Sequence, residues 1–230
     1  NVLSQAIRTG TRSSRLARLQ TRFVTERLGR LFPGLVFEEV AVSSPGDRDQ
    51  ALALTESPPD FFTRDLDDLV LNGGIDCAVH SAKDLPEPLR EGLDGFWLPW
   101  REDPRDALVC RAGVLPESLP ADVRIGVSSE RRIAYCRRRF PAARLLPIRG
   151  DIPRRLRQLD EGSYDLLVVA GAALNRLVLA ARVSEWIDPA ELPPPEGQGA
   201  LALTFRRDDV RFLTLRGCFV KAVTFAGAGV

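Results

Sequence analysis

The hydrophobic positions of this chain follow two spacings, short unbroken runs and a recurrence every three or four residues. In the first hundred residues the unbroken runs predict strands over 6–11, 36–43 and 75–79. Ser13 and Ser14 follow the first run and can cap a helix. The apolar face predicted for that helix consists of Leu16, Leu19, Phe23, Leu28 and Leu31.

A second amphipathic helix is predicted over 61–72, and the same alternation of strands and helices resumes after Trp100. The further strands are predicted over 107–111, 125–127, 145–148, 165–170 and 200–205. The further helices are predicted to begin near Arg131, to begin at the cap Asp151, and to cover 174–187. Strands that alternate with helices are typical of an α/β fold. We therefore predict the α/β class.

Two similar lobes explain the two successive sets of strands and helices. The chain would cross between the lobes near 98–106 and again near 190–199, where Pro193, Pro194 and Pro195 make a stiff connection. The predicted boundaries are 1–100 with 197–209 for the first lobe, 101–192 for the second lobe, and 210–230 for a remnant or the beginning of a further domain.

The composition is that of an ordinary soluble protein, with 44% hydrophobic and 27% charged residues. No apolar run reaches the roughly 18–20 residues that a membrane-spanning helix needs. Residues 1–12 lack the basic and then apolar pattern of a secretion signal. We therefore expect a cytoplasmic monomer without a membrane partner. The chain contains no methionine, even at position 1, which suggests part of a longer gene product.

The cysteines and the histidine give no sign of a metal site. The four cysteines are widely spaced, without a C-x-x-C pair, and they are Cys77, Cys110, Cys136 and Cys218. This spacing indicates neither structural zinc nor a disulfide framework, and we interpret the first three as buried small hydrophobic residues. His80 is the only histidine, and it is interpreted more simply as a capped residue at a strand end than as a catalytic base.

Positive charge is concentrated in one segment, although the net charge of the whole chain is only +1. Residues 131–157 contain ten arginines and one acidic residue, Asp151, a net charge of +9. A GC-rich genome would explain the use of arginine in place of lysine, but not the clustering. Nucleic acid is not the expected partner, because the segment contains only Tyr135 and Phe140 as aromatic residues and the whole chain is nearly neutral.

Three predicted strand-to-helix junctions carry arginine beside small or hydroxyl residues. They are Thr11–Ser14, Ser128–Arg132 and Arg149–Asp151. The free N–H groups and the positive dipole at the beginning of a helix favour an anion, and arginine adds a planar fork that matches carboxylate or phosphate. One such junction is explained by ordinary helix capping, but three in one chain predict a multiply charged anionic ligand.

A further polar segment, His80–Pro86, follows a strand that is predicted to be buried, a common position for functional groups in open α/β sheets. It contains Asp84 next to Lys83. From composition alone, the two residues are explained as well by a surface ion pair worth less than about 1 kcal/mol. The residues by themselves leave both interpretations open.

Five segments resemble, in order and in spacing, the motifs of one enzyme family. They are AVHSAKDLP (78–86), REDPRDALV (101–109), GVSSERR (126–132), IRGDIPRRLRQLDEGSYD (148–165) and PEGQGALAL (195–203). The family is that of porphobilinogen deaminase, also called hydroxymethylbilane synthase, and the resemblance runs from about Ile7 to Asp209. It implies two periplasmic-binding-protein-like lobes of type II, joined by crossover hinge segments, with a cleft between them. The third α+β domain of the family would be absent or truncated here.

The resemblance implies a transferase of tetrapyrrole (haem) biosynthesis. The family joins four porphobilinogen units head to tail into hydroxymethylbilane and releases ammonia at each step. A dipyrromethane cofactor, bound through a cysteine thioether in the third domain, primes the growing chain. The expected partners are therefore porphobilinogen and linear pyrrole intermediates, whose acetate and propionate groups would account for the clustered arginines.

Through the matching motifs, Asp84 is similar to the family's catalytic carboxylate. That carboxylate hydrogen-bonds pyrrole N–H groups, assists the loss of ammonia and stabilises the cationic azafulvene, help that is worth roughly 10²–10⁴ in rate. The residues that match contacts to substrate or cofactor are Arg12, Ser14, Lys83, Arg131, Arg132, Arg149, Arg155 and Arg176, with Ser81, Ser128 and Ser129 as companions.

Two departures from the family's pattern bear on activity. Residues 56–62 read ESPPDFF, where the family usually has a loop with glycine and lysine over the cleft. Arg216–Gly217–Cys218 resembles the cofactor-bearing turn of the family but comes too early in the chain. Cys218 is therefore only a candidate for cofactor attachment.

The tail Val223–Val230 is similar to the opening strand and glycine loop of tetrapyrrole methyltransferases, which suggests a fusion protein. Two alternatives to the enzyme therefore stay open. One is a non-catalytic module that binds a pyrrole or a tetrapyrrole, and the other is a fragment of a tetrapyrrole-biosynthesis fusion protein.

Overall fold

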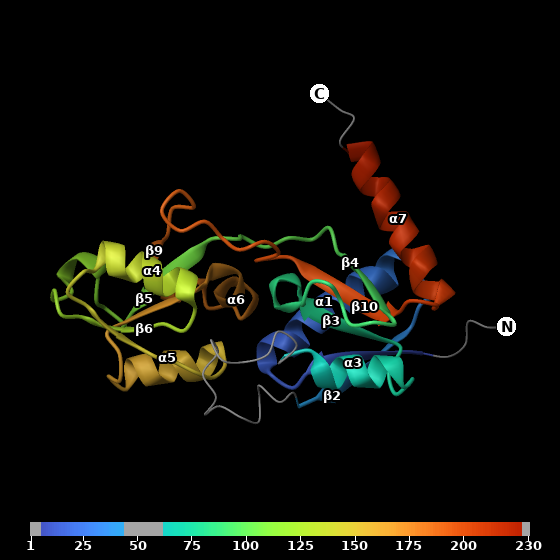
Figure 1. Cartoon of the computed structure of the whole chain (residues 1–230), viewed down its shortest axis with the longest axis horizontal. Helices are drawn as coiled ribbons and strands as arrows, with labels where there is room; N and C mark the ends of the chain where they lie inside the picture. Colours follow the sequence, from blue (N-terminus) through green and yellow to red (C-terminus); the bar gives the residue numbers. More distant parts are fainter. Residues whose placement is uncertain (1–5, 44–61, 227–230) are drawn as a thin grey trace. The chain divides into compact units, whose positions relative to one another are not determined.

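The computed structural model describes residues 6–43 and 62–226, with 220–226 described by the backbone alone. Within these residues the chain divides into two compact units, with 6–43, 62–101 and 200–226 in unit 1 and 102–199 in unit 2. Each unit contains one five-stranded sheet, and helices flank each sheet (Figure 1). The predicted α/β class is confirmed.

The sheet of unit 1 combines parallel and antiparallel strands. Its strands are β1 (Ile7–Arg12), β2 (Phe37–Val42), β3 (Cys77–Ser81), β4 (Leu93–Trp97) and β10 (Leu201–Arg206). They lie in the order β2-β1-β3-β10-β4. β1 is parallel to β2 and β3, whereas β10 is antiparallel to β3 and β4. Because β10 lies between β3 and β4, it joins distant parts of the sequence in one sheet.

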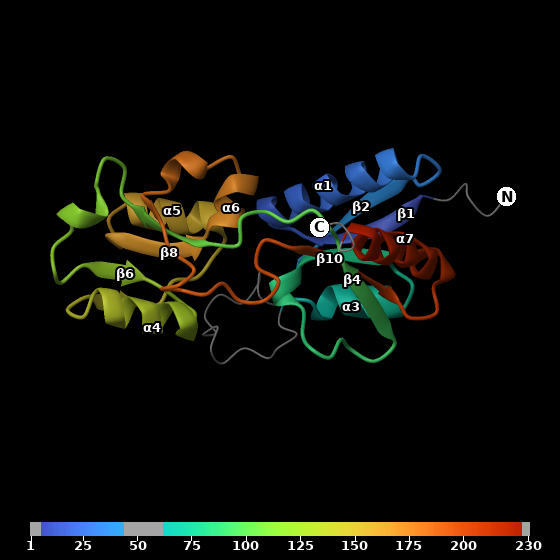
Figure 2. The ribbon, with the colours of Figure 1, turned by 90° about the horizontal axis from the view of Figure 1, so that it is seen from above.

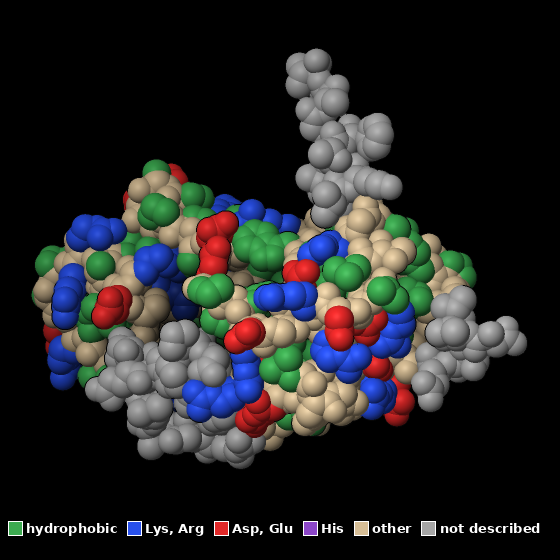
Figure 3. Space-filling model, turned by 45° about the vertical axis from the view of Figure 1, so that its right-hand side comes forward, with side chains coloured by type: hydrophobic (Ala, Val, Ile, Leu, Met, Phe, Trp, Pro, Cys, Tyr) green, Lys and Arg blue, Asp and Glu red, His purple; other side chains and the backbone are tan. Residues whose placement is uncertain are grey.

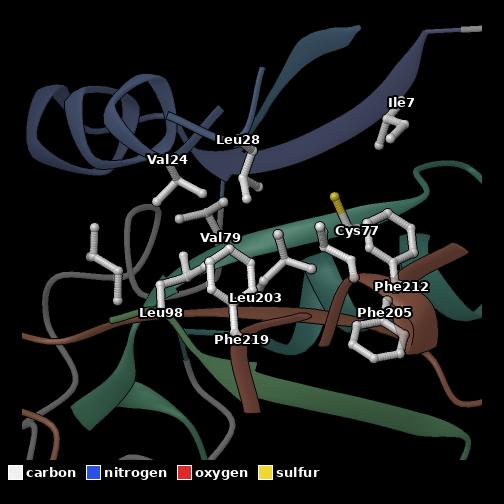
Figure 4. Packing of buried hydrophobic residues seen from close by; sticks show 12 residues of the cluster. Ile7, Val24, Leu28, Cys77, Val79, Leu98, Leu203, Phe205, Phe212 and Phe219 are labelled. Atoms are coloured by element: carbon white, nitrogen blue, oxygen red, sulfur yellow. The ribbon is translucent and has the colours of Figure 1, made fainter. Parts of the chain in front are cut away.

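Helices pack on both faces of this sheet. They are α1 (Arg15–Leu31), α3 (Arg64–Leu71), the short 3-10 helix η2 (Ala82–Asp84) and α7 (Val210–Ala226). Cys77 and Val79 of β3 belong to the hydrophobic cluster that also contains side chains of α1 and α7 (Figure 4), whereas Ala78 packs with Leu66 and Val70 of α3. Successive side chains of a strand point to opposite faces, so β3 is buried on both sides.

The buried face of α1 differs from the predicted one. The buried residues of the helix are Gln20, Thr21, Val24 and Leu28. Of the predicted apolar face only Leu28 lies among them, and Phe23 and Leu31 are 36% and 56% exposed. Thr21 tolerates burial because its hydroxyl donates to the carbonyl oxygen of Ala17 at 3.0 Å. The apolar spacing therefore predicted the helix correctly, but docking on the sheet selected a neighbouring face.

The sheet of unit 2 repeats the arrangement of unit 1. Its strands are β5 (Asp106–Cys110), β6 (Arg124–Gly126), β7 (Arg144–Leu146), β8 (Leu166–Ala170) and β9 (Glu185–Trp186). They lie in the order β7-β6-β8-β5-β9. β6 is parallel to β7 and β8, and β5 is antiparallel to β8 and β9. In both sheets the parallel strands therefore direct their carboxyl ends to one edge.

The helices of unit 2 also lie on both faces of their sheet (Figure 2). They are α4 (Glu130–Arg139), α5 (Ile152–Asp160) and α6 (Gly171–Arg176), with the 3-10 helices η3 (Pro116–Ser118) and η4 (Ala180–Arg182). Leu166 and Val168 of β8 pack in a cluster with residues of α4, whereas Leu167 and Val169 pack in a cluster with residues of α5. A strand buried on both faces reads as a continuous apolar run, which explains why it was visible in the sequence.

The predicted helix over 174–187 is wrong beyond its first turn. α6 ends at Arg176, the Leu179 N–H donates to the Leu174 carbonyl at 2.8 Å, and the Val178 N–H donates to the Asn175 carbonyl at 3.0 Å. These two bonds form the Schellman closure of a helix. The chain then turns away, and residues 185–186 form β9, which pairs with β5.

The sequence analysis also missed β4 and α7. Gly95 lies within β4, and glycine weakens the local signal for a strand. In α7, Phe212, Leu215 and Phe219 complete the hydrophobic cluster of unit 1. The backbone of residues 223–226 belongs to α7 rather than to a strand, and 227–230 lie outside the described residues.

The predicted burial of Cys77, Cys110 and Cys136 is confirmed, and Cys218 is exposed. Within the described part of the chain, no helix combines the length and the apolar character needed to cross a membrane.

Replacing Val178 by glycine is expected to stabilise the protein. Val178 has a φ of 60°, a left-handed conformation that costs a residue with a Cβ roughly 1–2 kcal/mol. It is 88% exposed, so little packing is lost. Glycine also gives the unfolded chain more conformational freedom, which offsets part of the relieved strain. V178G should therefore raise the free energy of unfolding by about 0.5–1 kcal/mol, measured by urea unfolding. The control V210G removes another exposed valine, at the beginning of α7, and should bring no gain. Equal effects of the two changes would contradict this explanation.

Candidate functional site

Predicted site residues of unit 1 lie at one edge of its sheet. β1 ends at Arg12 and β3 ends at Ser81, and because the two strands are parallel their carboxyl ends meet at the same edge. Ser14 is the N-cap of α1 and accepts a hydrogen bond from the Ala17 N–H. η2 places Lys83 and Asp84 directly after β3. The fold therefore brings these side chains to a common edge.

Asp84 belongs to a turn that the backbone holds in place. The Ala82 N–H donates to the carbonyl of Ala200, immediately before β10, at 3.0 Å, and the Leu85 N–H donates to the Ala82 carbonyl at 3.3 Å. Asp84 is partly buried, and Lys83 beside it is exposed. A carboxylate on a fixed turn can accept hydrogen bonds from a ligand without first having to be ordered.

Arg12 lies against an aromatic ring that the sequence analysis did not single out. Its guanidinium carbon is 4.6 Å from the centroid of the Phe62 ring, within the range of a cation–π interaction. Phe62 is the last residue of the segment 56–62, and the rest of that segment lies outside the described residues. The departure noted for this loop therefore stays a prediction.

His80 is a buried, neutral histidine. It is 5% exposed, and its Nε2 lies 2.9 Å from the Thr204 hydroxyl oxygen. Burial, and next the positive charge of Arg12, lower the pKa of His80 to about 4. At neutral pH the ring therefore carries no charge, which agrees with the interpretation of a satisfied residue at a strand end.

In unit 2 the helices α4 and α5 begin at the carboxyl ends of parallel strands, α4 after the cap Ser129 and α5 after the predicted cap Asp151. Ser129 accepts a hydrogen bond from the Arg132 N–H at 3.4 Å, and Asp151 accepts one from the Arg154 N–H at 2.9 Å. Such caps satisfy the free donors of the first turn. The positive ends of both helices are thus directed to the same edge of the sheet.

Ser128 has a structural contact in place of an open hydroxyl. Its Oγ accepts a hydrogen bond from the Ile148 N–H at 3.3 Å and donates to the Ile148 carbonyl. These bonds join the segment after β6 to the segment after β7. Ser128 therefore holds together the two loops that carry the arginines of this edge.

Three guanidinium groups lie close together at this edge of unit 2. The Nε of Arg155 donates to the Gly150 carbonyl at 2.8 Å, which directs the side chain back to the beginning of α5. Burial, and next the charges of Arg132 and Arg149, lower the pKa of Arg155 to about 10. The charges of Arg132 and Arg149 thus act on Arg155, and a carboxylate among the three would form charge-assisted hydrogen bonds with them. This cluster is the strongest sign of a ligand site in the described residues.

Asp106, which the sequence analysis did not select, pairs with two of the predicted arginines. It is 0% exposed. Its Oδ1 accepts from Arg132 Nε at 3.0 Å and from Nη2 at 2.7 Å, and its Oδ2 lies 2.6 Å from Nη2 of Arg131. Arg131 also donates through Nη1 to the Pro193 carbonyl at 2.9 Å. An acidic residue directly before a fully apolar strand was the signal that could have found it.

Arg176 contacts the segment that leads out of unit 2. Its Nη2 donates to the Gly199 carbonyl at 2.7 Å, and the same carbonyl accepts from the Glu102 N–H at 2.9 Å. Gly199 has a φ of 83°, and a Cβ there would overlap the Glu102 carbonyl. Neighbouring Asn175 donates to the Glu102 carboxylate at 2.9 Å. Arg176 therefore fixes backbone at the boundary of the unit.

Many of the other arginines form ion pairs on the surface. Arg8 and Arg211 both pair with Asp76, and Arg111 and Arg124 both pair with Asp165. The space-filling view shows basic and acidic side chains interspersed on the visible face (Figure 3). The cluster around Arg155 differs because positive charges predominate there. Among the described residues, no group of three or more His, Cys, Asp and Glu side chains is arranged to hold a metal ion.

Sequence comparison identifies relatives over most of the chain. A protein family described as "Porphobilinogen deaminase, dipyromethane cofactor binding domain" matches residues 7–214. The chain is 39% identical over 206 residues to the porphobilinogen deaminase of Syntrophobacter fumaroxidans, an alignment that covers 89% of this chain and 67% of the relative. It is 44% identical over 213 residues to the probable porphobilinogen deaminase of Methanopyrus kandleri, which covers 91% of this chain and 70% of the relative.

Structure comparison identifies proteins of similar fold. One is an ABC transporter periplasmic substrate-binding protein from Coxiella burnetii, with a TM-score of 0.52, 12% identity, and coverage of 88% of this chain and 85% of that chain. Another is the effector binding domain of BenM, solved with its effector benzoate, with a TM-score of 0.55, 12% identity, and coverage of 99% and 96%. At such low identity the similarity concerns the fold alone, and it confirms the predicted fold of periplasmic-binding-protein type.

The stability of the protein is expected to fall as the pH falls from about 6.5 to about 4. The pKa of His80 is near 4 in the folded state against 6.5 without the fold, so between these values the unfolded chain binds more protons. This contribution amounts to about 3 kcal/mol. H80Q should remove this part of the pH dependence in urea unfolding, whereas the control T204V, which keeps the histidine, should retain it. A pH dependence in H80Q as steep as that of the wild type would refute the assignment.

Citrate, a tricarboxylate, is expected to bind the arginine cluster and raise the melting temperature. R155Q removes one of the three neighbouring charges and should reduce this increase by more than half, because each charged hydrogen bond contributes roughly 1.5–3 kcal/mol. The control is R157Q, on an exposed position of the same helix, which makes the same change of net charge. If citrate raises the melting temperature of both variants equally less than that of the wild type, the overall positive charge explains citrate binding and the cluster does not.

Proposed function

Because the chain belongs to the porphobilinogen deaminase family, we propose that it is a transferase that condenses porphobilinogen units head to tail into hydroxymethylbilane, with release of ammonia. The observation that carries this proposal is the cluster of Arg132, Arg149 and Arg155, in a chain whose other unit carries Asp84 on a fixed turn. The cluster suits a ligand with many carboxylates, and Asp84 suits a reaction that creates positive charge.

Substrate binding follows from the chemistry of the two partners. Each pyrrole carries an acetate and a propionate group, and a guanidinium offers two parallel N–H donors to a carboxylate. Burial, and next repulsion by Arg132 and Arg149, lower the pKa of Arg155, and a carboxylate between the guanidiniums would relieve the repulsion. The free energy of that relief favours the bound ligand, so the cluster selects a polycarboxylate over a neutral pyrrole.

Asp84 is proposed to act on the ring nitrogen of the substrate. When ammonia leaves, the bond between the aminomethyl carbon and its nitrogen breaks, and positive charge spreads over the pyrrole ring. A carboxylate that accepts the ring N–H stabilises this charge as it develops. The same aminomethyl carbon then forms a bond to the free ring carbon of the terminal pyrrole of the growing chain, and that ring carbon loses its proton. Asp84 can accept or pass on that proton.

The dipyrromethane group named in the family description fits the donor set present here, because guanidinium forks match its carboxylate groups. Arg132, Arg149 and Arg155 would hold it. When bound, the group supplies the pyrrole carbon to which the first porphobilinogen is joined. Cys218 is exposed on α7, and its Sγ lies 3.5 Å from the Thr214 carbonyl. Attachment of the cofactor to Cys218 stays a prediction from the sequence.

The other residues predicted to contact substrate or cofactor are proposed to have different roles in binding. Arg12, Lys83, Ser14 and Ser81 would contact ligand from the edge of the unit 1 sheet. Ser129 and Arg131 would do so from the beginning of α4. Ser128 and Arg176 would act mainly on the backbone that they contact. We also propose a location in the cytoplasm, without nucleic acid or membrane as partner, since the composition is that of an ordinary soluble protein and the net charge is only +1, and we propose a monomer.

Incubation of the purified protein with porphobilinogen, with cofactor supplied, tests the activity through ammonia release and bilane formation. D84N should lower kcat by roughly 10²–10⁴ and change KM little, because Asp84 acts on the charge that develops in the reaction. The matched control is E87Q, an exposed carboxylate three positions further on, which should retain kcat. Binding of porphobilinogen by the wild type without any ammonia release would refute the enzyme and indicate a pyrrole-binding module.

A further inference from the structure

Two aspartates of unit 2 each pair with two arginines, and they lie at opposite ends of one sheet. Asp106 begins β5, and Asp165 directly precedes β8. The two strands are antiparallel neighbours, with Asp106 opposite Ala170. Asp106 therefore lies at the end of the sheet where α4, α5 and α6 begin, whereas Asp165 lies at the other end. The two carboxylates have similar ion pairs but lie at different ends of the sheet, so Asp165 can serve as the control for Asp106.

The contacts of Asp165 keep sheet and loop together. Its Oδ2 accepts from the Arg124 backbone N–H and from Nε, both at 3.0 Å. Its Oδ1 accepts from Arg124 Nη2 at 2.9 Å and from Arg111 Nη2 at 3.1 Å. The side chains of Arg111 and Arg124 are 43% and 32% exposed. This is an ordinary structural ion pair at the amino end of the sheet.

The contacts of Asp106 are directed to the candidate site. Arg131 and Arg132 are in the first turn of α4, where the positive end of the helix dipole repels a cation. Asp106 supplies an anionic partner to both side chains there, and the Pro193 carbonyl also accepts from Arg131. Asp106 holds one edge of the Arg132 guanidinium through Nε and Nη2. A second fork of donors, between Nη1 and Nη2, lies on the adjacent edge of that group, which shares Nη2.

We propose that Asp106 is a positioning residue, which orients the guanidiniums of Arg131 and Arg132 so that they bind a carboxylate of the ligand. This inference rests on the proposed function for the identity of the ligand, but not for the presence of a carboxylate site. Asp106 is fully buried, so it acts on the ligand only through the two arginines. Its carboxylate also keeps two adjacent cations together without attracting a counterion from solvent.

Citrate binding, measured by isothermal titration calorimetry on the full chain, tests the positioning. D106N removes the charge that orients both guanidiniums and should weaken citrate binding by about 10–100-fold, as the loss of a partner behind a metal ligand weakens metal binding. The control D165N loses a comparable double ion pair at the other end of the sheet and should change citrate binding less than about twofold. Equal weakening in both variants, or no citrate binding by the wild type, would overturn the proposal.

A second variant carries the test if D106N does not fold. D106E retains the charge but moves the carboxylate by one methylene, about 1.5 Å, so both guanidiniums should be displaced and citrate binding should stay weakened. Wild-type affinity in D106E would show that any nearby negative charge suffices and would overturn the positioning role of Asp106.

Combining D106N with R131Q and R132Q should add nearly nothing to the loss of citrate affinity caused by the two arginine changes, because Asp106 acts only through them. A further large loss would contradict this.

The same variants separate this inference from the proposed function. If Asp106 positions the arginines of the substrate site, D106N should raise KM for porphobilinogen more than it lowers kcat, and D165N should change neither. If the wild type binds citrate in the expected pattern but releases no ammonia from porphobilinogen, the proposed function fails and the positioning role of Asp106 stands. If turnover occurs while D106N and D165N behave alike, the positioning role fails instead.

Discussion

The arrangement of unit 2 depends on how the repulsion among Arg132, Arg149 and Arg155 is compensated. Burial, and next the charges of Arg132 and Arg149, lower the pKa of Arg155 to about 10. A buried carboxylate, Asp106, pairs with Arg131 and Arg132, and backbone carbonyls accept one donor each from Arg131 and Arg155. The excess positive charge is the property that prepares the unit for a polycarboxylate.

The common topology of the two sheets explains where the chemically useful side chains lie. In both units the parallel strands end at one edge, and the helices that follow begin there. In unit 1 this edge carries the carboxylate of Asp84 on η2. In unit 2 the same edge carries predominantly guanidiniums, at the positive ends of α4 and α5. The same sheet topology therefore presents a carboxylate in unit 1, which is proposed to stabilise a developing cation. In unit 2 it presents guanidiniums, which are proposed to bind anions.

The cores make these edges rigid. β3 and β8 are buried on both faces, so each strand is held by helices from two sides before it delivers a residue to the edge. The boundary between the units is ordered by contacts within unit 2, where the Gly199 carbonyl accepts from Arg176 and from Glu102. Only glycine fits at position 199, because its φ of 83° and the nearby Glu102 carbonyl leave no place for a Cβ.

The sequence by itself determined the α/β class, the cap Asp151, and the clustering of arginine, because apolar spacing, capping residues and charge are local properties. The tertiary structure alone decided the buried face of α1, the early end of α6 at the left-handed Val178, and the pairing of Asp106 with Arg131 and Arg132. Each of these depends on contacts between residues that are distant in sequence or on how an element docks. Local spacing carries no record of such contacts, so the chain had to be folded before they could be identified.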